Sequence, residues 1–189
     1  PPYFNGREYS QWGTYPGYLD DMDRAWAECY RVCCEGARIV VNVAHGYGRP
    51  STTGYLSRGA DTAKALEAAG FTLRGNIVWR KPGASSSTAW GSWMSASNPS
   101  LRDQHELIIV AHKGMARRDG GKSTIDRETF LACSLSVWDM QPAHTKGHPA
   151  PFPEELVRRA LEFYSFLGDL VLDPFCGSGT AGAVAFRLG

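Results

Sequence analysis

Apolar positions along the chain follow helical spacing and then strand spacing, in alternation. The first helical pattern spans residues 20–35, and Gly36 follows where a helix would end. Its apolar positions are Met22, Ala25, Trp26, Cys29, Tyr30 and Cys33. Residues 38–45 form a β-branched run typical of a strand buried on both faces, as in a parallel sheet. A second helix is predicted at residues 62–70 and a second strand at residues 71–80.

The second half of the chain repeats this alternation. The pattern predicts a strand at residues 106–112 and an amphipathic helix at residues 154–167. A further strand at residues 170–173 runs into a glycine-rich turn at 174–180, which opens a closing helix. Helices that alternate with buried strands predict a doubly wound α/β sheet. A length of 189 residues with 43% hydrophobic content suits one domain over residues 1–189.

Two long stretches interrupt the alternation. Residues 82–103 are rich in Ser, Gly and Trp, and residues 113–147 carry several basic side chains. Connections this long inside a compact domain usually serve a function or are disordered. We therefore predict loops in both places, with short elements of secondary structure at most.

Charge and composition narrow the class of protein. The formal net charge is +1, which by itself gives no electrostatic signature of nucleic-acid binding. No apolar run approaches the roughly 20 residues that span a bilayer, and the first residues lack the features of a signal peptide. The sequence thus predicts a cytoplasmic protein without a membrane segment. Five cysteines without paired spacing indicate reduced thiols, and no metal site is expected.

The glycine-rich turn is the sharpest local signal. Asp173, Pro174 and Phe175 lead into Gly177-Ser178-Gly179-Thr180 at the start of the closing helix. Glycines let the backbone approach a ligand closely, and a helix N-terminus offers free N–H groups. The turn is not a Walker loop, because no Lys follows its last glycine, and it lacks the glycine spacing of a dinucleotide fingerprint. Alone, it is equally explained as a tight connection between a strand and a helix.

Two proline-rich segments accompany the turn. The chain opens with PPYF at residues 1–4, which alone would be an ordinary surface segment. HPAPFP at residues 148–153 directly precedes the predicted helix 154–167, where it would also serve as a rigid helix entry.

Taken together and in this order, the three segments resemble the amino-methylating DNA methyltransferases of the permuted β class. In that family a (D/S)PPY motif precedes an FxGxG cofactor motif, and an HPAPFP-type segment lies just upstream of the latter. The resemblance extends over nearly the whole chain. It implies a Rossmann-like fold, S-adenosylmethionine as cofactor and double-stranded DNA as substrate, in a bacterial, archaeal or phage-infected cell. The polar residue expected before Pro1 and the acid expected after Gly189 lie outside the sequence, so we expect a chain truncated at both ends.

The resemblance also assigns roles to individual residues. The catalytic segment is Pro1, Pro2 and Tyr3. Cofactor binding is expected from the turn residues Asp173, Pro174, Phe175, Gly177, Ser178, Gly179 and Thr180, and from His148, Pro149 and Phe152 at the methionine end. Contacts with DNA are expected at Phe4, Arg80, Lys81, Ser85, Trp90, Trp93 and Arg102, with recognition loops at 82–103 and 113–147. For the tryptophans, packing of the loop on the core is an equal alternative.

The chemistry implied by the resemblance needs no covalent intermediate. An exocyclic amine is a poor nucleophile because its lone pair is delocalised into the ring of the base. In the family the flipped base lies against the motif's tyrosine, here Tyr3, and backbone acceptors such as the carbonyl of Pro1 localise the lone pair. Methylation at C5 of cytosine would instead use a cysteine that follows a proline, and the sequence contains no Pro-Cys pair.

The target atom and some alternatives stay open. Residues 3–9, 89–93 and 98–106 look more like the group that methylates N4 of cytosine than like the adenine N6 enzymes. The alternatives are adenine N6 methylation, methylation of RNA or a protein glutamine, and a nucleotide-binding module without turnover. The order of the motifs argues against the RNA and glutamine enzymes. A restriction–modification partner and a homodimer are both compatible with the class.

Overall fold

The computed structural model describes residues 1–4, 12–46, 54–83, 91–143 and 152–189. Their helices and strands follow in this order: α1 Tyr15–Val32, β1 Arg38–Ala44, α2 Arg58–Ala68, β2 Thr72–Arg80, β3 His105–His112, α3 Arg127–Cys133, β4 Val137–Asp139, α4 Glu154–Tyr164 and α5 Thr180–Leu188. The loop predicted at 113–147 therefore contains two short elements, α3 and β4.

The sheet has the strand order β1-β3-β2-β4. Strand β3 runs antiparallel to both β1 and β2, whereas β4 is parallel to β2. The prediction of parallel pairing for residues 38–45 is therefore wrong, although β1 and β2 do run in the same direction. No helix intervenes between β2 and β3 in the described chain, and β3 returns between its two neighbours in the opposite direction. Strand β1 is buried on the face of Val41 and Val43 and only half-buried on the other face, so the predicted burial on both faces holds in part.

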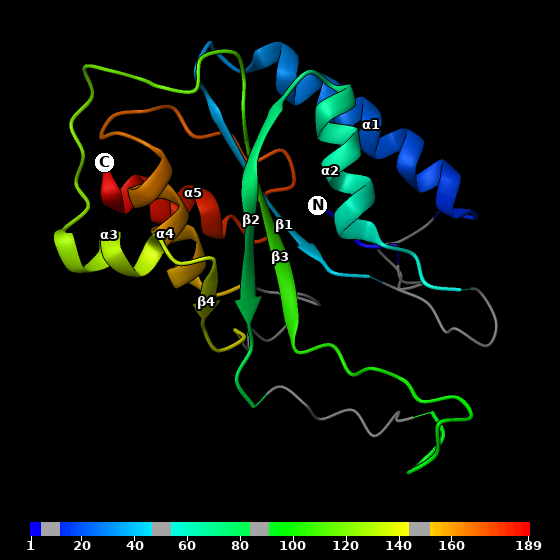
Figure 1. Ribbon diagram of the computed structural model, residues 1–189. Coiled ribbons are helices and arrows are strands. Elements are labelled where there is room, and N and C mark those ends of the chain that lie inside the picture. The colour runs from blue at the N-terminus through cyan, green and yellow to red at the C-terminus, as the bar shows by residue number, and fades with distance from the viewer. Residues whose placement is uncertain (5–11, 47–53, 84–90, 144–151) are drawn as a thin grey trace.

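Helices cover both faces of the sheet, as Figure 1 shows, with α1 and α2 on one side and α3, α4 and α5 on the other. The central strand β3 divides its apolar side chains between the two layers. Ile109 and Ala111 join the core that β1 forms with α1 and α2, and Ile108 and Val110 join the core formed with α3, β4 and α4. We call these the first and the second core. The predicted α/β architecture is confirmed.

Three predicted helices differ from the structure at their ends. Helix α2 spans Arg58–Ala68, where a helix at residues 62–70 was predicted. Helix α1 begins five residues before the predicted start at Asp20, because Thr14 caps it: the Thr14 hydroxyl accepts a hydrogen bond from the Gly17 amide at 3.2 Å. Helix α4 ends at Tyr164 and not at Leu167.

The strand predicted at residues 170–173 is wrong. These residues lie in the described part of the chain but join no ladder, and Leu170 is 99% exposed. An apolar run becomes a strand only where a neighbouring strand satisfies its backbone, and no described strand lies beside this one.

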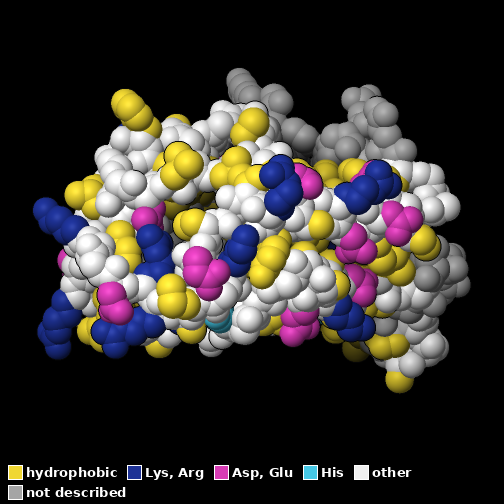
Figure 2. Space-filling view, turned by 90° about the horizontal axis from the view of Figure 1, so that it is seen from above, with side chains coloured by type: hydrophobic (Ala, Val, Ile, Leu, Met, Phe, Trp, Pro, Cys, Tyr) yellow, Lys and Arg dark blue, Asp and Glu magenta, His cyan; other side chains and the backbone are white. Residues whose placement is uncertain are grey.

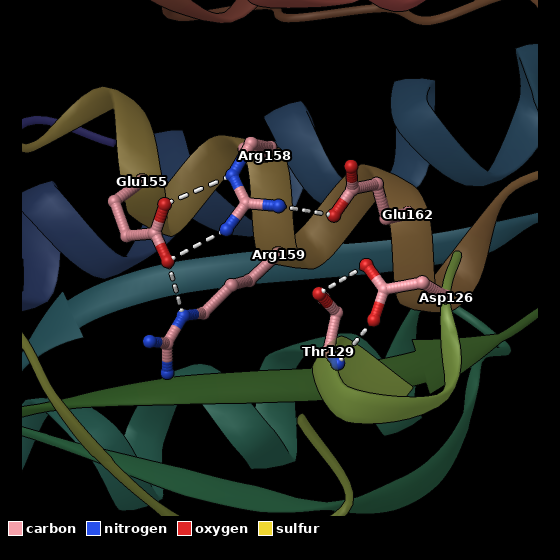
Figure 3. Close-up of polar contacts among 6 residues, drawn as sticks. All are labelled: Asp126, Thr129, Glu155, Arg158, Arg159 and Glu162. Carbon is pink, nitrogen blue, oxygen red and sulfur yellow. Dashed lines mark hydrogen bonds and ion pairs between the residues drawn. The ribbon is translucent and has the colours of Figure 1, made fainter. Parts of the chain in front are cut away.

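Ion pairs and a helix cap order the outer surface of α3 and α4 (Figure 3). Arg158 on α4 binds Glu155 and Glu162 on the same helix, and Arg159 donates to Glu155 at 2.7 Å. Asp126 caps α3 by accepting hydrogen bonds from the Thr129 amide and hydroxyl at 2.9 and 2.8 Å. On the face drawn in Figure 2, basic and acidic side chains are interspersed. Within the described ranges, no helix is both long and apolar enough to cross a bilayer.

Candidate functional site

The predicted catalytic segment meets the sheet near the end of β1. The hydroxyl of Tyr3 donates a hydrogen bond to Oε2 of Glu106 at 3.0 Å. Glu106 lies near the start of β3 and is paired with Ala44 of β1 and Trp79 of β2. The hydrogen bond therefore ties Tyr3 to the central strand of the sheet.

Two further side chains converge on the Glu106 carboxylate. Nδ2 of Asn42 on β1 donates to Oε2 of Glu106 at 2.6 Å and lies 3.4 Å from the Tyr3 hydroxyl. The ammonium group of Lys81 forms an ion pair with Oε1 of Glu106 and lies 4.3 Å from the centre of the Trp79 ring. We call Tyr3, Asn42, Lys81 and Glu106 the Glu106 network.

Burial and charge keep Tyr3 protonated. Burial raises the pKa of the Tyr3 phenol well above its usual range, and the Glu106 carboxylate raises it further. The guanidinium of Arg58 opposes this shift in pKa, and it lies 5.2 Å from the centre of the Tyr3 ring. At neutral pH the Tyr3 hydroxyl is therefore a hydrogen-bond donor and not a phenolate.

The backbone on both sides of Tyr3 is held by side chains of α1 and α2. The hydroxyl of Tyr18 donates to the Pro2 carbonyl at 3.2 Å. Arg58 is 5% exposed and donates to the carbonyls of Phe4, at 3.4 Å, and Gly46, at 2.5 Å. These bonds give the segment a defined backbone position.

Phe4 belongs to an aromatic cluster at the start of α1. Its ring centre lies 5.4 Å from that of Tyr15 and 6.0 Å from that of Tyr18. The ring therefore has a packing role in this structure, and its predicted contact with DNA stays a prediction.

The glycine-rich turn forms as its residue types require. Oδ1 of Asp173 accepts a hydrogen bond from the Phe175 amide at 3.0 Å, and the Gly179 amide donates to the Cys176 carbonyl at 2.7 Å. Gly177 and Gly179 have φ angles of 49° and 79°, in the left-handed region that favours glycine. Gly179 is the N-cap of α5, so the turn leads directly into a helix N-terminus.

The turn and the catalytic segment meet on the first core. The ring of Phe175 lies edge-on to Trp26 of α1, with centres 5.6 Å apart, and Tyr3 packs on the same core. The Asp173 carboxylate lies within electrostatic range of the Pro1 backbone. The structure thus brings together the two ends of the chain, which hold the two strongest motifs.

The other predicted site residues have different positions. Phe152 packs against the second core, on the far side of the sheet from Tyr3. Arg80 forms an ion pair with Asp139, and both side chains are about half exposed. Trp93 is 66% exposed and Arg102 is half-buried. Four predicted residues lie outside the described residues: Ser85, Trp90, His148 and Pro149.

Two basic residues of the predicted loop 113–147 have structural contacts. The ammonium group of Lys113 donates to the carbonyls of Tyr30 and Cys33 at the end of α1, at 2.7 and 2.8 Å. Arg118 forms two hydrogen bonds of 2.6 Å with the Asp169 carboxylate. These contacts fasten the loop to α1 and to the segment before the glycine-rich turn.

All five cysteines are free thiols, as predicted. Within the described ranges, no group of three or more His, Cys, Asp or Glu side chains is placed to hold a metal ion.

Sequence reasoning missed three residues of the site: Asn42, Arg58 and Glu106. Asn42 is the one uncharged polar residue in the β1 sequence RIVVNVA, and Glu106 is the one acidic residue of β3. A polar side chain inside an otherwise apolar strand was therefore the available signal. Arg58 had no such signal, because an arginine in the first turn of a helix is usually solvated.

The comparison with known families covers the entire chain. Residues 1–189 match the model of the N6_N4_Mtase family, whose description is DNA methylase. The chain belongs to this family, which confirms the predicted resemblance.

Curated relatives are methyltransferases of type II systems. The chain is 28% identical to the type II beta methyltransferase M.BslI of Bacillus sp. (strain NEB-606), over 99% of this chain and 22% of M.BslI. It is 29% identical to the type II methyltransferase M.MjaI of Methanocaldococcus jannaschii, over 86% of this chain and 58% of M.MjaI. The chain thus spans less than two thirds of the length of either relative.

Solved structures share the fold. TTHA0409 of Thermus thermophilus, assigned to the DNA modification methylases and solved with S-adenosyl-L-methionine, has a TM-score of 0.78 and 29% identity. That match covers 100% of this chain and 74% of TTHA0409. The cytosine-N4-specific PvuII DNA methyltransferase has a TM-score of 0.72 at 21% identity, over 100% of this chain and 69% of the PvuII enzyme, a likeness of fold alone. The predicted Rossmann-like methyltransferase fold is confirmed.

Proposed function

We propose that this chain is the catalytic region of a site-specific DNA methyltransferase that transfers a methyl group from S-adenosylmethionine to an exocyclic amino group. Membership of the DNA methylase family supports the class of enzyme. The observation that carries the proposal is the convergence of the Pro1–Tyr3 segment and the glycine-rich turn on the first core. A donor site and an acceptor site must meet in this way for direct transfer.

The residues of the glycine-rich turn fit S-adenosylmethionine. A Cβ placed on Gly179 meets no atom within 4 Å, so open space lies beside the turn at the N-terminus of α5. The relative TTHA0409 was solved with this cofactor, which supports the same cofactor here. When bound, S-adenosylmethionine supplies an electrophilic methyl group on a sulfonium. Asp173, Gly177 and Gly179 would hold it, and Phe175 would offer a ring to the positive charge.

The catalytic segment prepares the amine of a flipped base. The Pro1 carbonyl accepts a hydrogen bond from the amine and so localises the nitrogen lone pair, and the Tyr3 ring stacks on the base. The bonds from Tyr18 to Pro2 and from Arg58 to Phe4 hold this backbone rigid. With the cofactor bound, transfer would form the N–C bond and break the S–C bond, with the neutral thioether as the leaving group and the extra amine proton released to water. Holding the amine in line with the methyl group lowers most of the barrier to transfer, and a rigid backbone segment provides that positioning.

N4 of cytosine is the proposed target atom, and N6 of adenine in the same class of enzyme is the alternative. The proposal is supported by residues 3–9, 89–93 and 98–106, which look more like the cytosine group. RNA or a protein glutamine is a weaker alternative, because the catalytic motif precedes the cofactor motif here. Base flipping and DNA contacts at Arg80, Lys81 and Arg102 belong to the same proposal.

Separate substitutions test the two halves of the site in the full-length protein. Tyr3→Ala removes the stacking ring, so we expect most turnover to be lost while the affinity for S-adenosylmethionine is nearly unchanged. Gly177→Val forces a branched side chain into a left-handed turn, so we expect the cofactor affinity itself to fall. Calorimetry measures the affinity and labelled methyl transfer to duplex DNA measures turnover. Equal loss of cofactor binding in both variants would show that the two motifs do not have separate roles.

A further inference from the structure

Glu106 is an acidic side chain in a place that folding alone does not require. It lies on the central strand β3, and its side chain is 14% exposed. The residues that follow it, Leu107 to Ala111, are all apolar. A carboxylate this deep needs partners to offset its desolvation, and here it has the three donors Tyr3, Asn42 and Lys81.

The stability of the sheet does not explain this arrangement. Well-packed apolar residues commonly replace a buried ion pair with no loss of stability, or with a gain. The Glu106 network instead joins β1, β3 and Lys81, the residue directly after β2, to Tyr3, which lies far from all of them in the sequence. Its geometry therefore serves the position of Tyr3.

The network defines how the Tyr3 ring is presented. The hydrogen bond from its hydroxyl to Glu106 fixes the far end of the ring, and the backbone bonds around Pro2 and Phe4 fix the near end. Arg58 lies over the ring at 5.2 Å. The ring is therefore held at both ends, and a guanidinium lies over it.

We propose, building on the function proposed above, that Glu106 is a positioning residue for methyl transfer: it holds Tyr3 where the flipped base stacks. Glu106 thus acts through Tyr3 and needs no contact with the base.

A double-mutant cycle tests this role in the full-length protein. The variants are Tyr3→Phe, which keeps the ring and removes its hydroxyl, Glu106→Gln, and the two combined. We expect each single variant to lower the single-turnover rate of methyl transfer by about tenfold, with cofactor affinity unchanged within about twofold. We expect the double variant to be no more than about twofold slower than either single variant, because one interaction is removed in all three.

Glu162→Gln is the matched control. The Glu162 side chain is also 14% exposed and also pairs with a cation, Arg158, but it lies on α4 beyond the second core. We expect the methyl-transfer rate of this variant to equal that of the wild type.

Several results would overturn the proposal. A Glu106→Gln rate equal to the wild type, losses that multiply in the double variant, or an equal loss in Glu162→Gln would each do so. If Glu106→Gln unfolds, Tyr3→Phe alone decides, and a loss below about twofold contradicts the proposal. A wild-type protein that methylates no DNA would instead refute the proposed function, and this inference with it.

Discussion

Replacing glycine by alanine should change the free energy of unfolding in opposite directions at Gly179, in the glycine-rich turn, and at Gly182, in helix α5. Gly179 has φ 79° and ψ 16°, so an L-residue there is strained by about 1 to 2 kcal/mol. A Cβ on Gly179 meets no atom within 4 Å, so no steric clash adds to that strain. Gly179→Ala should therefore lower the free energy of unfolding by about 1 to 2 kcal/mol.

Gly182 is the control, three residues further along in α5. A Cβ on Gly182 also meets no atom within 4 Å, and this glycine has helical backbone geometry. Alanine in a helix loses less conformational entropy on folding than glycine does, so Gly182→Ala should raise the free energy of unfolding by about 0.5 to 1 kcal/mol.

Urea unfolding of both variants measures these changes, and calorimetry measures the affinity for S-adenosylmethionine. We expect Gly179→Ala to weaken cofactor binding, because the strained turn relaxes away from its shape, and Gly182→Ala to leave binding unchanged. Changes in stability of the same sign at both positions would refute the left-handed geometry of the turn and the reasoning built on it.

Two further predictions concern charged residues. The hydrogen bonds from Arg118 lower the pKa of Asp169, so the pair stabilises the fold at neutral pH. This contribution begins to fall as the pH drops below the pKa of Asp169 in the unfolded chain. It is lost once the pH has dropped through the lower pKa of the folded protein. Asp169→Asn should therefore cost about 1 to 2 kcal/mol in urea unfolding at pH 7 and little in acid, and an equal loss in both would contradict the pair. If Arg80 contacts a phosphate, Arg80→Ala should weaken duplex binding. The slope of the logarithm of the binding constant against the logarithm of the salt concentration should then become shallower by about one. A slope unchanged from the wild type would remove Arg80 from the DNA surface.

Helices α1, α2, α4 and α5 and the three long strands could be predicted because each carries its own signal in the sequence, whereas α3 lies in a predicted loop. The apolar character of β1 was also visible in the sequence, but the direction of its neighbouring strand was not. Periodicity reports which residues are buried and not which strand lies alongside, so the antiparallel return of β3 was missed. Residues 170–173 show the reverse error, because an apolar run that looks like a strand has no strand beside it here.

The site could be predicted as two motifs but not as a network. Pro1–Tyr3 and the glycine-rich turn are contiguous in the sequence, and their residue types indicate their chemistry. Glu106 and Asn42 act through contacts with Tyr3 over 103 and 39 positions in sequence. Such contacts depend on the register of three strands, which the sequence pattern does not determine.

The central claim is that the protein methylates an exocyclic amine in DNA. The most direct test incubates the full-length protein with duplex DNA and S-adenosylmethionine carrying a labelled methyl group, then digests the DNA to nucleosides for mass spectrometry. We expect labelled N4-methylcytosine. Labelled N6-methyladenine would move the target atom and leave the class of enzyme intact. Labelled 5-methylcytosine, or no labelled nucleoside at all, would contradict the account.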